Sequence, residues 1–128
     1  QFNHNFAKAF GLSSALIVHE IAHMQPGGGN PVANYEYYRL MFGDLDKLPT
    51  SINNPEELIL RHQAAGERIP AIFMACGTED GLLENNRELR DFLKAKGVEH
   101  VYYESPGIHN WTFWNQYLEP AIQWMLED

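Results

Sequence analysis

The chain has 128 residues, enough for one compact domain around a single core. Its formal charge is −8, from 17 acidic and 9 basic residues, which argues against nucleic acid or an anionic membrane surface as the main partner. No stretch approaches the roughly 20 apolar residues of a membrane-spanning helix. Cys76 is the single cysteine, which excludes an internal disulfide and favours a buried thiol in a reducing, cytoplasmic compartment.

The first predicted element is a strand over residues 11–18 (GLSSALIV). It is nearly continuous in apolar residues, which is typical of a parallel strand covered on both faces. Its first residues loosely resemble the GxSxG motif of a nucleophile elbow, with Ser13 or Ser14 as the nucleophile. An elbow needs a strand before it and a helix after it, whereas strand-like residues follow here. We therefore do not expect either serine to be a nucleophile.

Residues 19–23 read HEIAH, an HExxH motif. On a helix, this motif places His19 and His23 on one face as zinc ligands, with Glu20 as a general base. The alternative is a polar exit from the preceding strand, favoured because Pro26 and three glycines would end a helix almost at once. Candidates for a third ligand are Glu36, Glu56 and Glu57, and the sequence singles out none of them. A zinc peptidase is thus the rival interpretation.

Residues 24–68 are irregular and resemble an insertion over a sheet. Tyrosines and apolar residues over 35–42 predict a short aromatic helix, from which Tyr35 is a candidate to reach a substrate. Asn54 followed by Pro55 predicts a capped helix that runs to about Ala65.

Residues 69–104 predict one β-α-β unit. Strands are expected over 69–76 and 98–104, and the segment between them has one apolar face and a Gly97 stop, as in an amphipathic helix. Such a unit implies a right-handed crossover between parallel strands. The tail is also helical, with Pro120 as the expected first residue of a second helical segment.

Strands that alternate with helices predict an α/β fold, with a mainly parallel sheet of about three strands flanked by helices. Its N-terminal edge would expose an apolar strand to pairing. We therefore expect this chain to be part of a larger protein, with an N-terminal half as its missing partner. The alternative is an inactive folded module that forms a homo-oligomer through the open edge.

Two polar segments follow the second and third predicted strands. Asp80 ends the sequence Gly77-Thr78-Glu79-Asp80, and His109 lies 29 residues later in Gly107-Ile108-His109. The carboxyl ends of parallel strands are where catalytic groups gather, and a carboxylate there can orient a histidine base. The alternatives are that Asp80 caps the next helix and that His109 caps or packs against the last one.

These residues carry a family resemblance. The stretch from ACGTEDGLLENN to YYESPGIHNWTFWNQYLEPAIQWML resembles the esterase D-like esterases, and within them the tributyrin-type esterases, which are similar to feruloyl and acetyl-xylan esterases. FAKAFGLSSALIV, FGDLDKL and SINNPEEL resemble further segments, so that residues 1–128 correspond to the C-terminal half of an α/β-hydrolase. The resemblance implies that Asp80 is the acid and His109 the base of a catalytic triad.

The resemblance also implies that the serine and the oxyanion hole belong to an upstream segment. It implies hydrolysis of short-chain acyl esters, with no metal or organic cofactor. The isolated chain is then expected to be inactive. Trp111 and Trp114, beside His109, are candidates to contact the substrate, although core packing is the alternative for such aromatic residues.

Overall fold

The computed structural model describes residues 6–127, which divide into two compact units. One unit contains the residues up to Leu16 together with those from Arg68 onward, and the other is Ile17–Glu67. The segment predicted as an insertion, residues 24–68, makes up most of the second unit.

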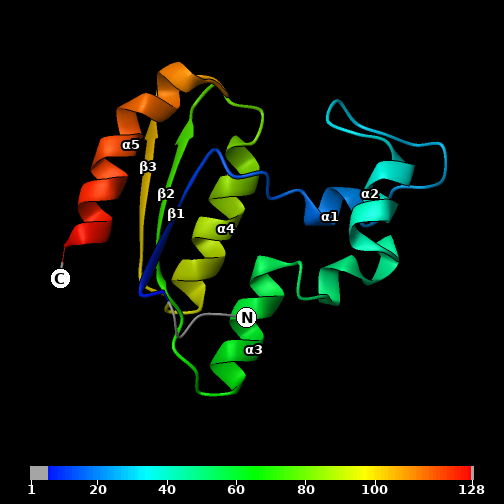
Figure 1. Cartoon of the computed structure of the whole chain (residues 1–128), viewed down its shortest axis with the longest axis horizontal. Coiled ribbons are helices and arrows are strands. Elements are labelled where there is room, and N and C mark those ends of the chain that lie inside the picture. Colours follow the sequence, from blue (N-terminus) through cyan, green and yellow to red (C-terminus); the bar gives the residue numbers. More distant parts are fainter. Residues whose placement is uncertain (1–5, 128) are drawn as a thin grey trace. The chain divides into compact units, whose positions relative to one another are not determined.

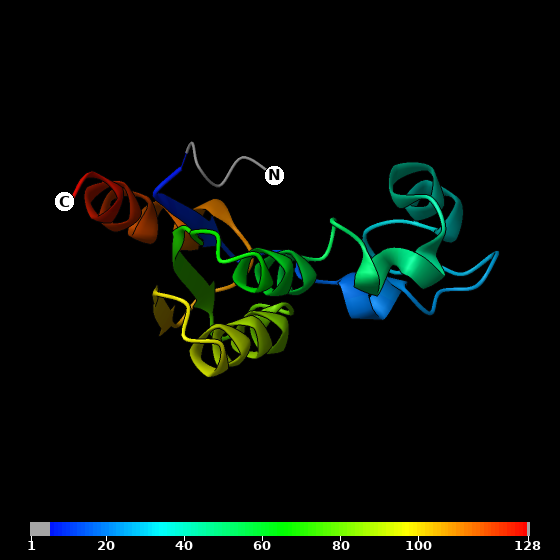
Figure 2. The same ribbon diagram turned by 90° about the horizontal axis from the view of Figure 1, so that it is seen from below.

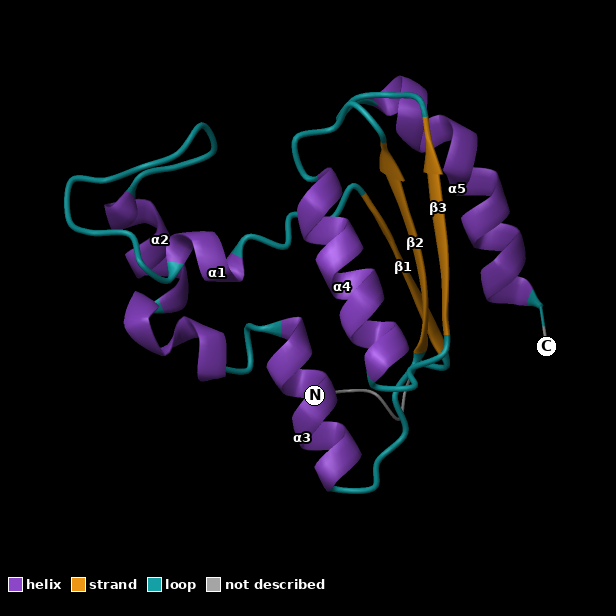
Figure 3. Ribbon diagram, turned by 180° about the vertical axis from the view of Figure 1, so that it is seen from behind, coloured by secondary structure: helices purple, strands orange, loops and turns teal. Residues whose placement is uncertain are grey.

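The first unit is built on a sheet of three parallel strands, in the order β1-β2-β3 (Figure 3). They are β1 (Lys8–Leu12), β2 (Ala71–Gly77) and β3 (His100–Ser105). The prediction of an α/β fold with a parallel three-stranded sheet is therefore confirmed. All three strands end at the same edge of the sheet, where the chain turns into the loops of the candidate site (Figure 1).

The prediction of the first strand over residues 11–18 is wrong in its bounds. The strand begins at Lys8, pairs with β2 up to Leu12, and ends where Ser13 adopts a left-handed φ of 48°. The apolar residues that suggested a longer strand serve a different core. Ile17 and Val18 pack into the second unit, and Val18 already begins a helix.

Two helices cover opposite faces of the sheet (Figure 2). They are α4 (Leu83–Ala95) and α5 (Trp111–Leu126). Successive side chains of a strand point to opposite faces, so Phe73 and Ala75 pack with Phe113 and Ala121 of α5. The helix predicted between the second and third strands is confirmed.

Helix α5 runs unbroken through Pro120, so the prediction that this proline starts a second segment is wrong. A proline removes one backbone N–H, and packing of the flanking residues against the sheet keeps the helix continuous despite that loss. Lys8 donates to the carbonyl oxygens of Trp124 and Glu127, at 2.8 and 2.6 Å, and so satisfies the C-terminal end of the helix.

The second unit is helical. It contains α1 (Val18–Ile21), α2 (Tyr35–Phe42), the 3₁₀ helix η2 (Leu45–Thr50) and α3 (Pro55–Ala64). Its core is formed by Ile21, Tyr38, Leu45 and Leu48. Asn34 caps α2 and Asn54 caps α3, which confirms the helices predicted at these two places. No helix within residues 6–127 has the length and apolar character needed to cross a membrane.

Candidate active site

Asp80 and His109 are brought together at the carboxyl end of the sheet. Asp80 follows β2, His109 follows β3, and the Nδ1 atom of His109 lies 3.0 Å from Oδ2 of Asp80. The Asp80 side chain is 1% exposed, whereas that of His109 is 49% exposed. A buried carboxylate thus meets the inner nitrogen of a half-exposed imidazole.

This contact determines how the imidazole can act. A carboxylate oxygen only accepts hydrogen bonds, so the proton of the contact lies on Nδ1 of His109. The Nε2 atom is then the basic nitrogen, and within residues 6–127 it has no hydrogen-bond partner. The other oxygen of Asp80 accepts from the backbone N–H of Leu82 at 2.9 Å, so Asp80 also supports the start of α4.

Two glycines let the two loops approach. A Cβ atom on Gly77 would lie 2.1 Å from the carbonyl oxygen of Gly107. Gly107 itself has a φ of +155°, and a Cβ there would lie 2.7 Å from the ring of Phe113. The backbones after β2 and β3 are therefore in direct contact, which places Asp80 within reach of His109.

Glu79 fastens the same two loops. Its carboxylate accepts from the backbone N–H of Gly107 at 2.6 Å and from the Thr78 hydroxyl at 2.9 Å. Its own N–H donates to the carbonyl of Gly107 at 3.0 Å. The hydrogen bond from Gly107, followed by that from Thr78, lowers the pKa of Glu79. Sequence reasoning missed this role, since a carboxylate beside Asp80 carries no separate signal.

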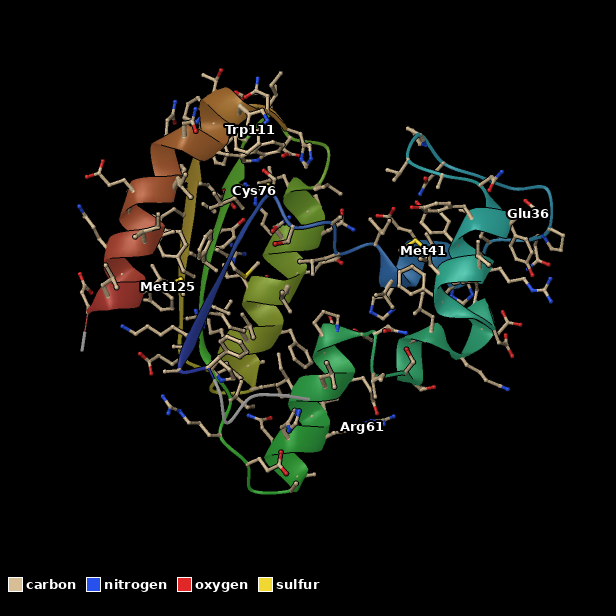
Figure 4. All side chains as sticks on the ribbon, viewed as in Figure 1. Glu36, Met41, Arg61, Cys76, Trp111 and Met125 are labelled. Atoms are coloured by element: carbon tan, nitrogen blue, oxygen red, sulfur yellow. The ribbon has the colours of Figure 1, made fainter. Side chains whose placement is uncertain are left out.

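Two tryptophans of α5 lie on one side of the imidazole. The rings of His109 and Trp114 meet edge to face, with centroids 4.9 Å apart. Trp111 packs edge to face on Trp114 at 5.2 Å and is 70% exposed. Figure 4 shows Trp111 at the start of α5, beyond the ends of the strands. Asn110 caps this helix by accepting from the N–H of Phe113 at 3.1 Å.

The chain as a whole is similar to known esterases and hydrolases. No family model matches the chain. It is 43% identical over 125 residues to an acetyl esterase of Caldicellulosiruptor saccharolyticus, an alignment that covers 98% of this chain and 47% of the esterase. The chain therefore spans about half the length of the curated relative it matches.

Solved structures show the same fold. The serine hydrolase FphF of Staphylococcus aureus, a fluorophosphonate-binding protein solved with substrate bound, matches with a TM-score of 0.78 at 26% identity, over 96% of this chain and 46% of its own. The S-formylglutathione hydrolase FrmB of the same species matches with a TM-score of 0.77 at 25% identity, over 95% of this chain and 45% of its own. This chain has the fold of the C-terminal half of an α/β-hydrolase. A ferulic acid esterase shares that fold at 19% identity and a TM-score of 0.60, over 94% of this chain and 41% of its own.

Ser13 directly follows β1 in the first unit. The prediction that strand residues follow Ser13 is wrong, because β1 ends at Leu12 and a loop leads from Ser13 to α1. The hydroxyl of Ser13 is nevertheless engaged: it accepts from Nε1 of Trp114 at 3.1 Å, and the residue is 3% exposed. These contacts favour a structural role for Ser13, and that neither Ser13 nor Ser14 is a nucleophile stays a prediction.

The HExxH motif does not form a helical ligand pair. Helix α1 has four residues and ends at Ile21, before His23. Nε2 of His19 instead lies 3.4 Å from the carboxylate of Glu56. Within residues 6–127, no group of three or more histidine, cysteine or acidic side chains is placed to hold a metal ion.

The remaining candidates lie in defined places. Tyr35 begins α2 in the second unit, where its N–H donates to the carbonyl of Gly28 and its ring packs against the core of that unit. A substrate contact from Tyr35 stays a prediction. Cys76 is buried in β2 (Figure 4), and burial, followed by the charge of Asp80, raises the pKa of its thiol to about 11. The prediction of a buried thiol is confirmed.

Proposed function

We propose that this chain supplies the acid and the base of the catalytic triad in a serine carboxylic-ester hydrolase. The observation that carries the proposal is the 3.0 Å contact between buried Asp80 and the inner nitrogen of half-exposed His109. Support also comes from the order of the two residues, since Asp80 precedes His109 and both follow parallel strands, as in α/β-hydrolases. The acetyl esterase relative, the serine hydrolase FphF and the S-formylglutathione hydrolase FrmB support the same chemistry.

The proposed mechanism uses a serine from a segment outside these 128 residues. Nε2 of His109 takes the proton of that serine as its oxygen attacks the ester carbonyl, and then passes the proton to the departing alcohol oxygen. Water, deprotonated by the same nitrogen, releases the acid from the acyl-enzyme. Asp80 keeps the proton on Nδ1 and stabilises the imidazolium that forms in each half of the reaction.

The proposed substrates are short-chain acyl esters, as in tributyrin-type and other esterase D-like esterases, including acetylated or feruloylated sugars. The names of the relatives, an acetyl esterase and a ferulic acid esterase, are consistent with this class. Trp111, exposed beside the ring that touches His109, is the proposed aromatic contact for the acyl or alcohol group. Tyr35 and its unit are proposed to act as a cap segment.

The proposed partner is the N-terminal half of the same hydrolase. Strand β1 pairs with β2 on one side, and within residues 6–127 no strand covers its other edge. Helix α5 also carries an exposed apolar stripe of Leu118, Ile122 and Met125, which share one helix face. An open parallel strand beside an apolar helix face is the kind of surface that a further part of an α/β layer fold covers.

Complementation tests this proposal. The chain is mixed with the N-terminal segment of the related acetyl esterase, ending where the similarity begins, and hydrolysis of p-nitrophenyl acetate and labelling by a fluorophosphonate probe are measured. We expect activity only from the mixture, with a loss of about 10³-fold or more for His109→Ala and for Asp80→Asn. The matched control, His23→Ala, should leave the activity unchanged.

Other outcomes would contradict the proposal. Equal hydrolysis by the wild-type mixture and the His109→Ala mixture would remove His109 from the mechanism. A loss of activity in His23→Ala together with stoichiometric bound zinc would favour the HExxH peptidase instead. Light scattering of the chain alone distinguishes a homo-oligomer, in which a second copy covers the β1 edge, from a monomer.

A further inference from the structure

Trp114 is tied to a part of the fold that is far from it in sequence. Its indole N–H donates to the hydroxyl of Ser13 at 3.1 Å, across 101 residues. The acceptor is 3% exposed, so water does not readily replace this hydrogen bond. The bond therefore fixes the orientation of the indole relative to the end of β1.

Ser13 is itself rigidly held. Its backbone N–H donates to the carbonyl of Ala75 in β2 at 2.8 Å. Its φ of 48° sets the turn that takes the chain out of the sheet. Asn86 of α4, which is fully buried, holds the next residue by bonding both the N–H and the carbonyl of Ser14.

The indole in turn limits the movement of the candidate base. A single hydrogen bond to Asp80 holds one nitrogen of His109 but leaves the ring free to swing about that contact. The ring of Trp114, at right angles and 4.9 Å away, packs against the imidazole and blocks part of this motion. His109 thus has two supports, Asp80 at Nδ1 and Trp114 at the ring.

We propose that Ser13 and Trp114 form a positioning pair that holds the His109 imidazole in the orientation needed for proton transfer. The relevance of this pair to catalysis rests on the proposed function. Neither residue exchanges a proton with the substrate; they act through His109. Precise placement of a catalytic group strongly affects the rate, so a loosened imidazole should lower turnover more than substrate binding.

The test uses nitrogen-15 NMR of the histidine rings in the chain as it stands, without any need for activity. In the wild type we expect the Nδ1–H tautomer of His109 and slow exchange of that proton with water. Ser13→Ala removes the acceptor, and Trp114→Phe keeps an aromatic ring but removes the indole N–H. Each variant should speed exchange of the Nδ1 proton about tenfold. Ser14→Ala is the matched control, because the hydrogen bonds of Ser14 to Asn86 use its backbone, and it should leave the exchange rate unchanged.

A double variant separates positioning from general loosening. If the two residues act through one hydrogen bond, Ser13→Ala/Trp114→Phe should be little worse than either single change, whereas independent effects would multiply. In the complemented enzyme, the same variants should lower kcat about 10- to 100-fold with little change in KM.

The proposal is overturned if both single variants keep the wild-type circular dichroism and the wild-type Nδ1 exchange rate. It is also overturned if the exchange effects of the two changes multiply. A failure of complementation with the NMR effects intact would instead count against the proposed function, since the orientation of His109 would still depend on this pair.

Discussion

At the scale of single residues, the candidate site depends on positions where no side chain fits. Gly77 and Gly107 allow two loops to touch backbone to backbone, and the Asp80–His109 hydrogen bond spans that contact. Asp80 and His109 were predicted from their place after strands, but the close approach that joins them was not.

Gly77→Ala should therefore push apart the two loops that carry Asp80 and His109. The Cβ atom of the alanine would lie 2.1 Å from the backbone oxygen of Gly107. Because that oxygen belongs to the backbone, no side-chain movement can relieve the clash. We expect a loss of about 1–3 kcal/mol in the free energy of unfolding, measured in urea, and a weaker Nδ1–H signal of His109. Gly81→Ala is the control, because its Cβ would meet nothing within 4 Å. Equal stability of the two variants would show that the loops can separate at no cost.

At the scale of elements, a charged cluster fastens α4 to β3. Arg87 of the helix donates to both oxygens of Glu104 at 2.7 and 2.8 Å, and the Tyr102 hydroxyl donates to the same carboxylate at 2.8 Å. These bonds, that from Arg87 first, lower the pKa of Glu104 from 4.5 to about 2. The same carboxylate raises the pKa of Tyr102, after the larger effect of its burial.

This cluster should make stability depend on acid. A carboxylate whose pKa is lower in the folded than in the unfolded protein contributes its full stabilisation at pH values above the unfolded-state pKa. For Glu104, this stabilisation is lost as the pH falls from about 4.5 toward 2. Glu104→Gln should cost on the order of 1–3 kcal/mol at pH 7 and almost nothing near pH 2, measured by urea unfolding. Glu84→Gln is the control, because Glu84 also pairs with Arg87 but is 75% exposed. An unchanged pH profile in Glu104→Gln would contradict this role.

At the scale of the whole molecule, each of the two units has buried apolar residues of its own. Phe73, Phe113 and their neighbours form the core between the sheet and α5, whereas Tyr38, Leu45 and Leu48 form that of the second unit. Each unit buries its own apolar side chains, so each should open with its own free energy.

Leu48→Ala should therefore loosen one unit and spare the other. Leu48 is 1% exposed, and its truncation should cost about 2–5 kcal/mol within the second unit. Amide hydrogen exchange should accelerate over α2 and η2 but not over β2. Leu93→Ala, at a site 0% exposed in α4, should give the reverse pattern. Equal acceleration in both units from Leu48→Ala would mean that the two cores unfold as one.

Sequence alone determined the features that depend on local pattern. The hydrophobic periodicity of residues 69–104 predicts a strand, a helix and a strand, and such a unit implies parallel strands. The N-cap Asn54 begins its helix by accepting from the backbone N–H of Glu56, a contact that depends only on neighbouring residues. Asp80 and His109 could be chosen as the candidate pair because each directly follows a predicted strand.

Only the tertiary structure decided which apolar residues share a core and which polar atoms meet. Ile17 and Val18 were predicted as strand residues because a short apolar run can belong to a buried strand or pack into a helical core, and its composition does not distinguish the two. The sequence predicted Pro120 as the start of a helical segment because the packing of α5 against the sheet, which keeps the helix continuous at Pro120, involves residues far apart in the sequence. The bond between Ser13 and Trp114 joins residues 101 apart, and no pattern along the chain records such a contact, because it exists only once β1, β2 and α5 have packed together.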